Sequence, residues 1–217
     1  MPTNPEKQFL SNHIAIVGGS GSGKTWLAEK LCAELGTQAA HLSLDDFYRD
    51  LSHLEKATRD NVNFDDPAAI DWASVRAVAD TLAQGEMAQV PIYDFATHTR
   101  RPETRAFAPR ELVVWDGLWL LHENAIRGRF VWSVFVDCPE AERLSRRVAR
   151  DVLVRGRTEE SVRLQCLNQV QPMHDRFVEP QRDFADQILA APVTAAQVVR
   201  LKQELLERIQ RREVPHT

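Results

Sequence analysis

Cysteine is scarce in this chain, and the three that occur, Cys32, Cys138 and Cys166, are odd in number and far apart. They form no Cys-x-x-Cys pair, so the spacing excludes a zinc site or a disulfide framework and favours reduced, buried thiols. Long apolar runs are also lacking, since the longest, around residues 130–138, falls far short of the roughly 20 residues of a membrane span. The N-terminal residues lack the basic start and apolar core of a signal peptide. We therefore expect a cytoplasmic protein with no membrane partner.

An excess of positive charge is lacking as well, because 27 Lys and Arg residues stand against 31 Asp and Glu residues, for a net charge of −4. Domains that bind nucleic acids are usually basic, so we expect no nucleic-acid partner. The 217 residues show no internal repeat, compositional break or Gly/Ser linker. A chain of this length buries a core without needing a metal or disulfide. The sequence favours one domain over residues 1–217.

Short apolar runs alternate with segments of helical periodicity, which predicts strand–helix units and a mostly parallel sheet. The expected strands are 14–17, 39–44, 112–116, 131–136 and 187–191, and the expected helices are 24–35, 67–84, 139–154, 159–176 and 198–209. Asp66 is the expected N-cap of the helix that starts at Pro67. Residues 90–108 are interpreted as a strand pair or an ordered loop. The prediction is a three-layer α/β fold with polar insertions along one edge.

Residues 18–25 spell GGSGSGKT, which matches the Walker A pattern GxxxxGK[ST]. Its glycines let backbone N–H groups surround phosphate oxygens, while Lys24 adds a positive charge and the Thr25 hydroxyl is suited to Mg²⁺. The strand before and the helix after are the context that this motif needs. We therefore predict that a nucleoside triphosphate is bound by Gly18, Gly19, Ser20, Gly21, Ser22, Gly23, Lys24 and Thr25.

Acidic residues end two of the predicted strands. Asp116 follows an apolar run, as a Walker B carboxylate would, and could hold Mg²⁺ directly or through water; alternatively, it only begins a turn with Gly117. Asp45 and Asp46 end another strand, where one of them could accept the proton of a substrate hydroxyl. Both could instead be turn-forming or capping residues. Because the Asn-Lys-x-Asp motif of GTPases is missing, a kinase with a second substrate is favoured.

Six arginines lie between residues 143 and 157, namely Arg143, Arg146, Arg147, Arg150, Arg155 and Arg157. The first four fall on one face of the predicted helix, and only Asp151 offsets the six charges. An arginine-lined segment that closes over phosphates would neutralise charge and exclude water. We interpret about 143–163 as a lid, with a solvated charged face or a nucleic-acid-binding stripe as the alternatives.

Together, the blocks GGSGSGKT, LSLDDFY, NFDDPAAID, VPIYDFATHTR, VVWDGLWLL, RLSRRVARDVLVRGRTEESV and FVEPQRDFADQIL resemble the uridine–cytidine kinase family, in the phosphoribulokinase/uridine kinase group of P-loop kinases. The resemblance covers roughly residues 12–192. It implies a P-loop NTPase fold with a β-rich substrate-binding insertion at about 86–108 and an Arg-rich helical lid. It also implies transfer of a phosphoryl group from ATP or GTP, with Mg²⁺, to the 5′-hydroxyl of uridine or cytidine in pyrimidine salvage, and assembly as a tetramer.

The same resemblance implies roles for individual residues. Asp45 falls on the general base, which would act with Lys24, and Asp65 falls on the residue that grips the ribose hydroxyls. The other implied substrate contacts are Tyr48, Tyr93, Phe95, His98, Arg147, Arg157 and Gln165. Arg150 and Arg155 align with lid arginines at the nucleotide, and Thr25 and Asp116 with the metal position.

Several residues depart from the family pattern. Asp116 replaces the usual glutamate and is one methylene shorter. Asp46 stands where serine is usual, and the resulting Asp-Asp pair also occurs in nicotinamide riboside kinases. Asp66 replaces a common histidine and Cys166 a common tyrosine. Two alternatives therefore stay open: a kinase of another hydroxyl metabolite (nicotinamide riboside, a sugar phosphate or pantothenate), or a regulatory protein that binds nucleotide without catalysis. Tyr93 and Phe95 could also be plain core residues of a strand, and His98 a surface residue of a Thr/Arg-rich loop.

Overall fold

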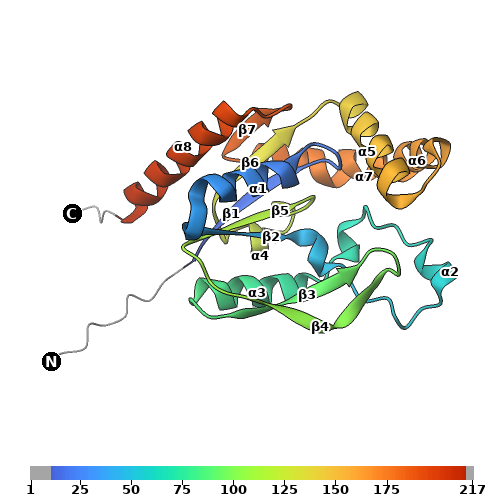
Figure 1. Cartoon of the computed structure of the whole chain (residues 1–217), viewed down its shortest axis with the longest axis horizontal. Coiled ribbons are helices and arrows are strands. Elements are labelled where there is room, and N and C mark those ends of the chain that lie inside the picture. The colour runs from blue at the N-terminus through green and yellow to red at the C-terminus, as the bar shows by residue number, and fades with distance from the viewer. Residues whose placement is uncertain (1–10, 214–217) are drawn as a thin grey trace.

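The main sheet consists of five parallel strands. The computed structural model describes residues 11–213, apart from the side chains of Val154, Arg155 and Glu213. The strands are β1 (Asn12–Gly18), β2 (Ala39–Ser43), β5 (Leu112–Gly117), β6 (Phe130–Asp137) and β7 (Gln187–Ala190), in the order β2-β5-β1-β6-β7. β1 lies at the centre and pairs in parallel with both β5 and β6. This confirms the predicted α/β class and its parallel sheet (Figure 1).

Two helical layers cover the two faces of this sheet. Side chains alternate along a strand, so Ile14 and Ile16 of β1 pack with α1 (Lys24–Leu35) and α8 (Ala195–Glu213). Ala15 and Val17 face the opposite side and pack in the cluster that includes α3 (Trp72–Ala83). All four of these β1 residues are completely buried. Figure 1 shows the sheet between the two layers, as the strand–helix alternation predicts.

A separate hairpin lies beside α3. It is formed by β3 (Ala88–Asp94) and β4 (Thr99–Phe107), which pair antiparallel and confirm the predicted strand pair. Arg100 ties this hairpin to the segment after β2. Its Nε and Nη2 donate to the carbonyls of Tyr48 and Phe47 at 2.8 and 3.1 Å, and its Nη1 pairs with Asp71 at 3.0 Å. The hairpin is thereby fixed against the residues that follow β2.

The arginine-rich segment forms α5 (Glu140–Arg155), which ends where Gly156 adopts a left-handed φ of +63°. After that turn, α6 (Glu159–Gln165) is capped by Thr158, whose hydroxyl accepts from the Ser161 amide. The predicted helix 159–176 is present, but π-helical turns at Cys166–Val170 and His174–Val178 flank α7 (Gln171–Met173). A 3₁₀ segment, Glu179–Phe184, then leads to β7.

The predicted helix start at Pro67 is wrong. The carboxylate of Asp66 does accept from the amide of Ala68 at 2.8 Å, but it caps only the 3₁₀ turn Pro67–Ala69. Ile70 is extended and bridges to Tyr48, so α3 begins two residues later, with Asp71 as its N-cap. The short helices α2 (Lys56–Arg59) and α4 (Asn124–Arg127) were not predicted, because a single turn gives no periodic pattern.

The helices of residues 11–213 include none that is both long and apolar enough to cross a lipid bilayer. This finding agrees with the lack of long apolar runs in the sequence.

Candidate active site

The phosphate loop joins the C-terminal end of β1 to α1. Gly21 and Gly23 have φ values of +82° and +97°, a region that favours glycine. A Cβ at Gly21 would also lie 2.6 Å from the carbonyl oxygen of Arg143, so the position has no room for a side chain. α1 then starts at Lys24, which places the positive end of the helix dipole at this loop. The loop therefore has the conformation and the strand–helix context that the predicted anion site requires.

The arginine-rich helix α5 contacts this loop through three arginines. Arg146 Nη1 donates to the carbonyls of Gly21 and Ser22 at 3.4 and 3.3 Å. Arg147 Nη1 donates to the Ser20 hydroxyl at 3.0 Å. Arg143 is buried against the loop, and a Cβ at position 19 would lie 2.8 Å from its side chain. These arginines share one helix face as predicted, yet they already have partners in the loop itself.

Asp116 lies at the end of β5, beside β1 and β2. Its Oδ2 accepts from the Thr25 hydroxyl at 2.6 Å, and its Oδ1 lies 2.7 Å from His41 Nε2. Burial alone would raise the pKa of Asp116, but hydrogen bonds and the nearby Lys24 charge hold this pKa below its ordinary value. Since a carboxylate only accepts hydrogen bonds, His41 donates through Nε2. Asp116 is thus an ionised, oriented carboxylate next to the phosphate loop.

The side chains of Thr25 and Asp116 are suited to Mg²⁺. Within the described part of the chain, no three His, Cys, Asp or Glu side chains gather as a metal cluster. Mg²⁺ at phosphates needs no such cluster, because one or two protein oxygens, substrate phosphates and water complete its shell. A hydroxyl and an ionised carboxylate 2.6 Å apart at a phosphate loop fit this requirement. Thr25 and Asp116 would therefore be the residues that hold the ion.

The two aspartates after β2 differ in environment. Burial raises the pKa of Asp45, the Lys24 charge opposes this shift, and the Asp116 charge adds to it. Asp45 is therefore close enough to Lys24 and Asp116 for both charges to affect its pKa. The carboxylate of Asp46 instead binds Arg105 of β4 at 3.2 Å. Because Arg105 already pairs with Asp46, Asp45 is favoured as the carboxyl available to a substrate.

The predicted base-pocket rings meet in one cluster. Tyr48 lies 5.2 Å from Tyr93 and 6.4 Å from Phe95, and Tyr93 lies 5.1 Å from Phe95, all between ring centroids. His98 stacks on Phe64 at 4.3 Å, and Phe64 contacts Tyr48 edge to face. The Tyr93 hydroxyl is buried and has no hydrogen-bond partner among the described residues. The cluster thus combines stacking faces with one unsatisfied polar atom.

The predicted lid residues form a second cluster on the other side of a hollow. Arg147 and Arg157 both donate to the Gln165 side-chain oxygen. The completely buried Asp151 forms ion pairs with Arg147 at 3.6 Å, Arg150 at 2.8 Å and Arg157 at 3.9 Å. Arg150 also acts electrostatically on Asp45. The side chain of Arg155 lies outside the described residues.

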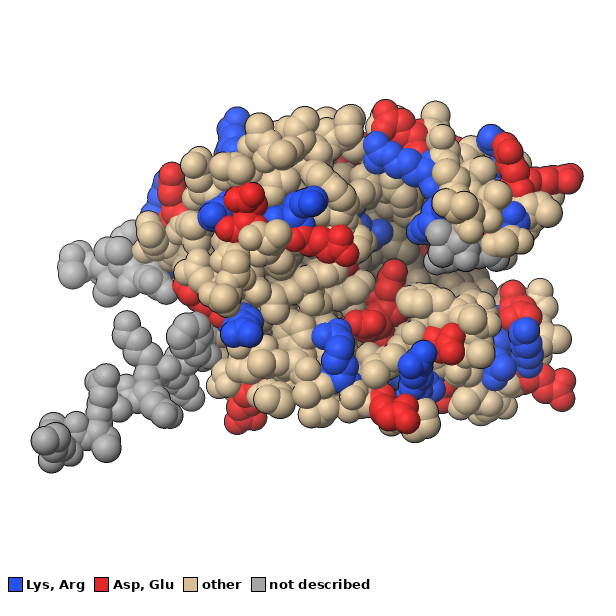
Figure 2. Space-filling model, viewed as in Figure 1, with Lys and Arg blue, Asp and Glu red and all other residues tan. Residues whose placement is uncertain are grey.

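Asp65 connects the two clusters. Burial raises its pKa, while the Arg147 charge opposes the shift. Arg147 Nη1 lies 3.6 Å from Asp65 Oδ1. Figure 2 shows the hollow between the α5–α6 segment above and the part that carries β3, β4 and α2 below. The ion pair between Asp65 and Arg147 therefore joins the loop before α3 to α5.

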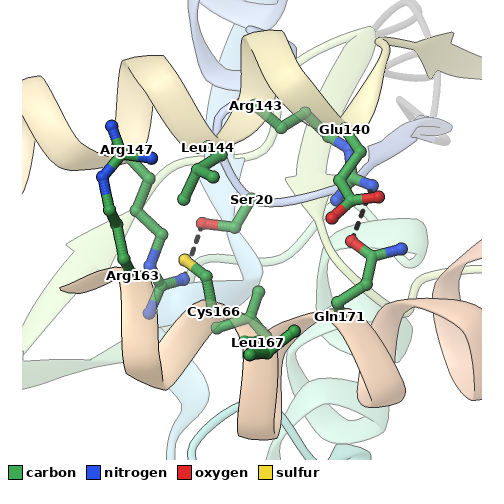
Figure 3. Close-up of a pocket in the computed structure, with 10 residues that line it drawn as sticks. Ser20, Glu140, Arg143, Leu144, Arg147, Arg163, Cys166, Leu167 and Gln171 are labelled. Carbon is green, nitrogen blue, oxygen red and sulfur yellow. Dashed lines mark hydrogen bonds between the residues drawn. The ribbon is translucent and has the colours of Figure 1, made fainter. Parts of the chain in front are cut away.

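A small pocket of about 90 Å³ lies between α5 and the segment after α6. Figure 3 shows Ser20 of the phosphate loop and Cys166 facing each other across it, with Leu144 and Leu167 nearby. Asp45, Asp65 and the aromatic cluster do not line this pocket. Its position separates it from the cleft where those residues meet.

Sequence reasoning missed His41 and Phe64 as parts of the site. A histidine within the apolar stretch of β2, next to the Asp116 strand, was the available signal for His41. Phe64 precedes Asp65 directly, but only the fold shows that it stacks on His98.

A phosphate loop, an ionised carboxylate on the neighbouring strand, a half-buried carboxyl and an arginine-rich helix against the loop together define a P-loop kinase. The model of the Phosphoribulokinase / Uridine kinase family matches residues 13–197, and the chain belongs to this family. It is a nucleotide-binding kinase, as the sequence predicts.

Individual proteins agree with this placement. The chain is 40% identical over 176 residues to a protein named uridine kinase from Chloroflexus aurantiacus, covering 81% of this chain and 84% of that one. It is 41% identical over 177 residues to a uridine kinase from Deinococcus deserti, covering 81% and 86%. Phosphoribulokinase from Rhodobacter spheroides shares the fold with a TM-score of 0.63 at 17% identity, covering 85% of this chain and 72% of that one.

Proposed function

We propose that this protein transfers a phosphoryl group from ATP to the 5′-hydroxyl of uridine and cytidine, forming UMP and CMP in pyrimidine salvage. The relatives named uridine kinase support the acceptor class. The observation that carries the proposal is that Tyr48 joins the candidate groups: its hydroxyl donates to the carbonyl of Phe64, next to Asp65, at 3.0 Å, and its ring lies 5.2 Å from that of Tyr93. One acceptor molecule can therefore contact the ribose candidate and the ring cluster together.

The donor would bind at the phosphate loop, with GTP as an alternative to ATP. Thr25 and Asp116 would hold Mg²⁺, which supplies charge neutralisation at the transferring phosphate. Lys24 and the lid arginines Arg147 and Arg150 add positive charge on the remaining sides. In phosphoryl transfer such positioning and charge stabilisation carry most of the catalysis.

Asp45 would accept the proton of the acceptor hydroxyl. Its pKa is raised by burial, which makes it a better base than an exposed aspartate. Asp46 is not suited to the role, because Arg105 of β4 already binds its carboxylate.

The nucleoside would be held at both ends. The Asp65 carboxylate can accept hydrogen bonds from two ribose hydroxyls, with Arg147 beside it. The rings of Tyr48, Tyr93 and Phe95 provide faces for a planar base. His98 and Gln165 are the candidates for its polar edge.

The proposal is tested by ADP release with Mg-ATP or Mg-GTP and a panel of uridine, cytidine, nicotinamide riboside, ribulose 5-phosphate and pantothenate. Activity confined to the two pyrimidine nucleosides is the expected result. Activity only with another acceptor would keep the kinase and discard the pyrimidine pocket. Nucleotide binding without any acceptor-dependent turnover would favour a regulatory protein.

A further inference from the structure

His41 is a polar residue in an otherwise apolar part of β2. Its side chain is 24% exposed and its Nε2 lies 2.7 Å from Oδ1 of Asp116, a residue that is itself only 2% exposed. The other carboxylate oxygen, Oδ2, accepts from Thr25 at 2.6 Å. Each carboxylate oxygen of Asp116 therefore has its own partner, His41 of β2 for Oδ1 and Thr25 of α1 for Oδ2.

This contact follows from the register of the sheet. His41 of β2 pairs with Val114 of β5, and Asp116 lies two residues further along β5. Residues two apart on a strand share a face, so the imidazole and the carboxylate lie diagonally on the same side of the sheet. The backbone ladder, and no flexible loop, sets their separation.

We propose that His41 is a positioning residue that orients the Asp116 carboxylate toward the metal site. By binding Oδ1, it stops rotation of the carboxylate and keeps Oδ2 beside the Thr25 hydroxyl, where the metal-holding oxygens would meet. The inference rests on the proposed function only in requiring a divalent cation at Thr25 and Asp116.

A hydrogen-bonded partner of a metal-binding side chain has a measurable effect. Removing such a partner typically costs about 10- to 100-fold in metal affinity. His41 has no place in the phosphate loop, so its loss should not change how nucleotide binds without metal. This separation distinguishes positioning from a general structural role.

The test compares His41→Leu, which removes the donor, with His41→Gln, which keeps an N–H in a similar place. His53→Leu is the matched control, since it removes an exposed histidine from the loop after β2. Mn²⁺ binding to the full-length protein with ADP is measured by electron paramagnetic resonance, and ADP binding without metal by calorimetry. Thermal unfolding shows that each variant is folded, and His41→Met is a second apolar variant if the leucine unfolds.

We expect His41→Leu to weaken Mn²⁺ binding about 10- to 100-fold, with metal-free ADP binding unchanged. His41→Gln should recover most of the affinity, and His53→Leu should match the wild type. Equal Mn²⁺ affinity in a folded His41→Leu or His41→Met protein would overturn the proposal, as would equal losses of metal-free and metal-dependent binding. A wild type that binds no Mn²⁺ with ADP would overturn the metal site itself. Failure to phosphorylate pyrimidine nucleosides would leave all these results unaffected.

Discussion

Arg147 of α5 and Asp65 of the loop before α3 approach each other across the cleft, with 3.6 Å between Nη1 and Oδ1. The same guanidinium donates to Ser20 of the phosphate loop and to Gln165 of α6. Arg147 therefore contacts the phosphate loop, α6 and the candidate ribose-binding carboxylate at once. Arg147 thus links the phosphate loop, where the donor would bind, to Asp65, where the acceptor would bind.

Replacing Arg147 with methionine should impair catalysis and acceptor binding together. The apolar stem is kept, while the donors to Ser20 and Gln165 are lost. We expect kcat to fall by about 100-fold, as for other donors at developing charge, and the KM for the nucleoside to rise. Steady-state kinetics measures both. Arg200→Met, which alters an exposed arginine of α8, is the control, and equal kinetics in the two variants would contradict the assignment.

Asp45→Asn should reduce turnover while nucleotide binding survives. Loss of a general base typically costs about 100- to 10,000-fold in rate. Trp26 offers a way to measure binding, because it is 41% exposed in the first turn of α1, whereas the other four tryptophans are at most 8% exposed. Its fluorescence should change when ADP is added, and the ADP affinity obtained from this change should be similar for the wild type and for Asp45→Asn.

Asp46→Asn is the matched control for that variant, since it breaks only the pair with Arg105. A greater loss of turnover in Asp46→Asn than in Asp45→Asn would move the base to Asp46.

Tyr93→Phe should separate substrate binding from folding. The Tyr93 hydroxyl is buried and has no hydrogen-bond partner within residues 11–213 as described, and burial raises its pKa to about 12. Removing an unsatisfied polar atom leaves the free energy of unfolding unchanged or higher. If the hydroxyl contacts the nucleoside, KM should rise by about 10-fold, equivalent to one neutral hydrogen bond. Unchanged KM with unchanged stability would make Tyr93 a core residue.

The protein should lose stability in mild acid because of His13. This imidazole is 3% exposed, and its Nδ1 accepts from Trp115 Nε1 at 2.8 Å. Burial lowers the pKa of His13 from 6.5 to about 4, the Arg129 charge adds to this shift, and the Ala79 carbonyl and Asp80 oppose it.

The direction of this pH effect follows because the folded protein favours the neutral form of the His13 imidazole. The contribution of His13 is fully present above pH 6.5 and is lost as the pH falls toward 4, by about 3 kcal/mol in total for a shift of this size. His13→Asn keeps an acceptor but does not titrate. Urea unfolding at pH 7 and pH 4.5 should show a smaller loss for this variant, and equal losses would show that other groups control acid unfolding.

Local patterns predicted much of this molecule. The Walker A run needs only eight consecutive residues, and the apolar run before Asp116 marks a strand whose end must lie beside it in a parallel sheet. Those predictions rest on short-range chemistry. Asp66 shows the limit, because Asp66 and Asp71 are both good N-caps, and only the bridge between Ile70 and Tyr48 decides which one starts α3.

Long-range contacts were not accessible in the same way. His41 and Asp116 are 75 positions apart, and their contact depends on the strand order β2-β5-β1. Likewise, nothing in the Arg-rich segment shows that Arg143 and Arg146 would pack against the phosphate loop while Arg147 reaches Asp65. The π-helical turns after α6 also have no sequence signature of their own.

The most direct test of the central claim is to identify the product. The protein is incubated with Mg-ATP and uridine, and the product is examined by ³¹P nuclear magnetic resonance and mass spectrometry. We expect 5′-UMP, formed in step with ADP and lost in Asp45→Asn. Phosphate on a different hydroxyl, or ADP formed without any phosphorylated nucleoside, would contradict it.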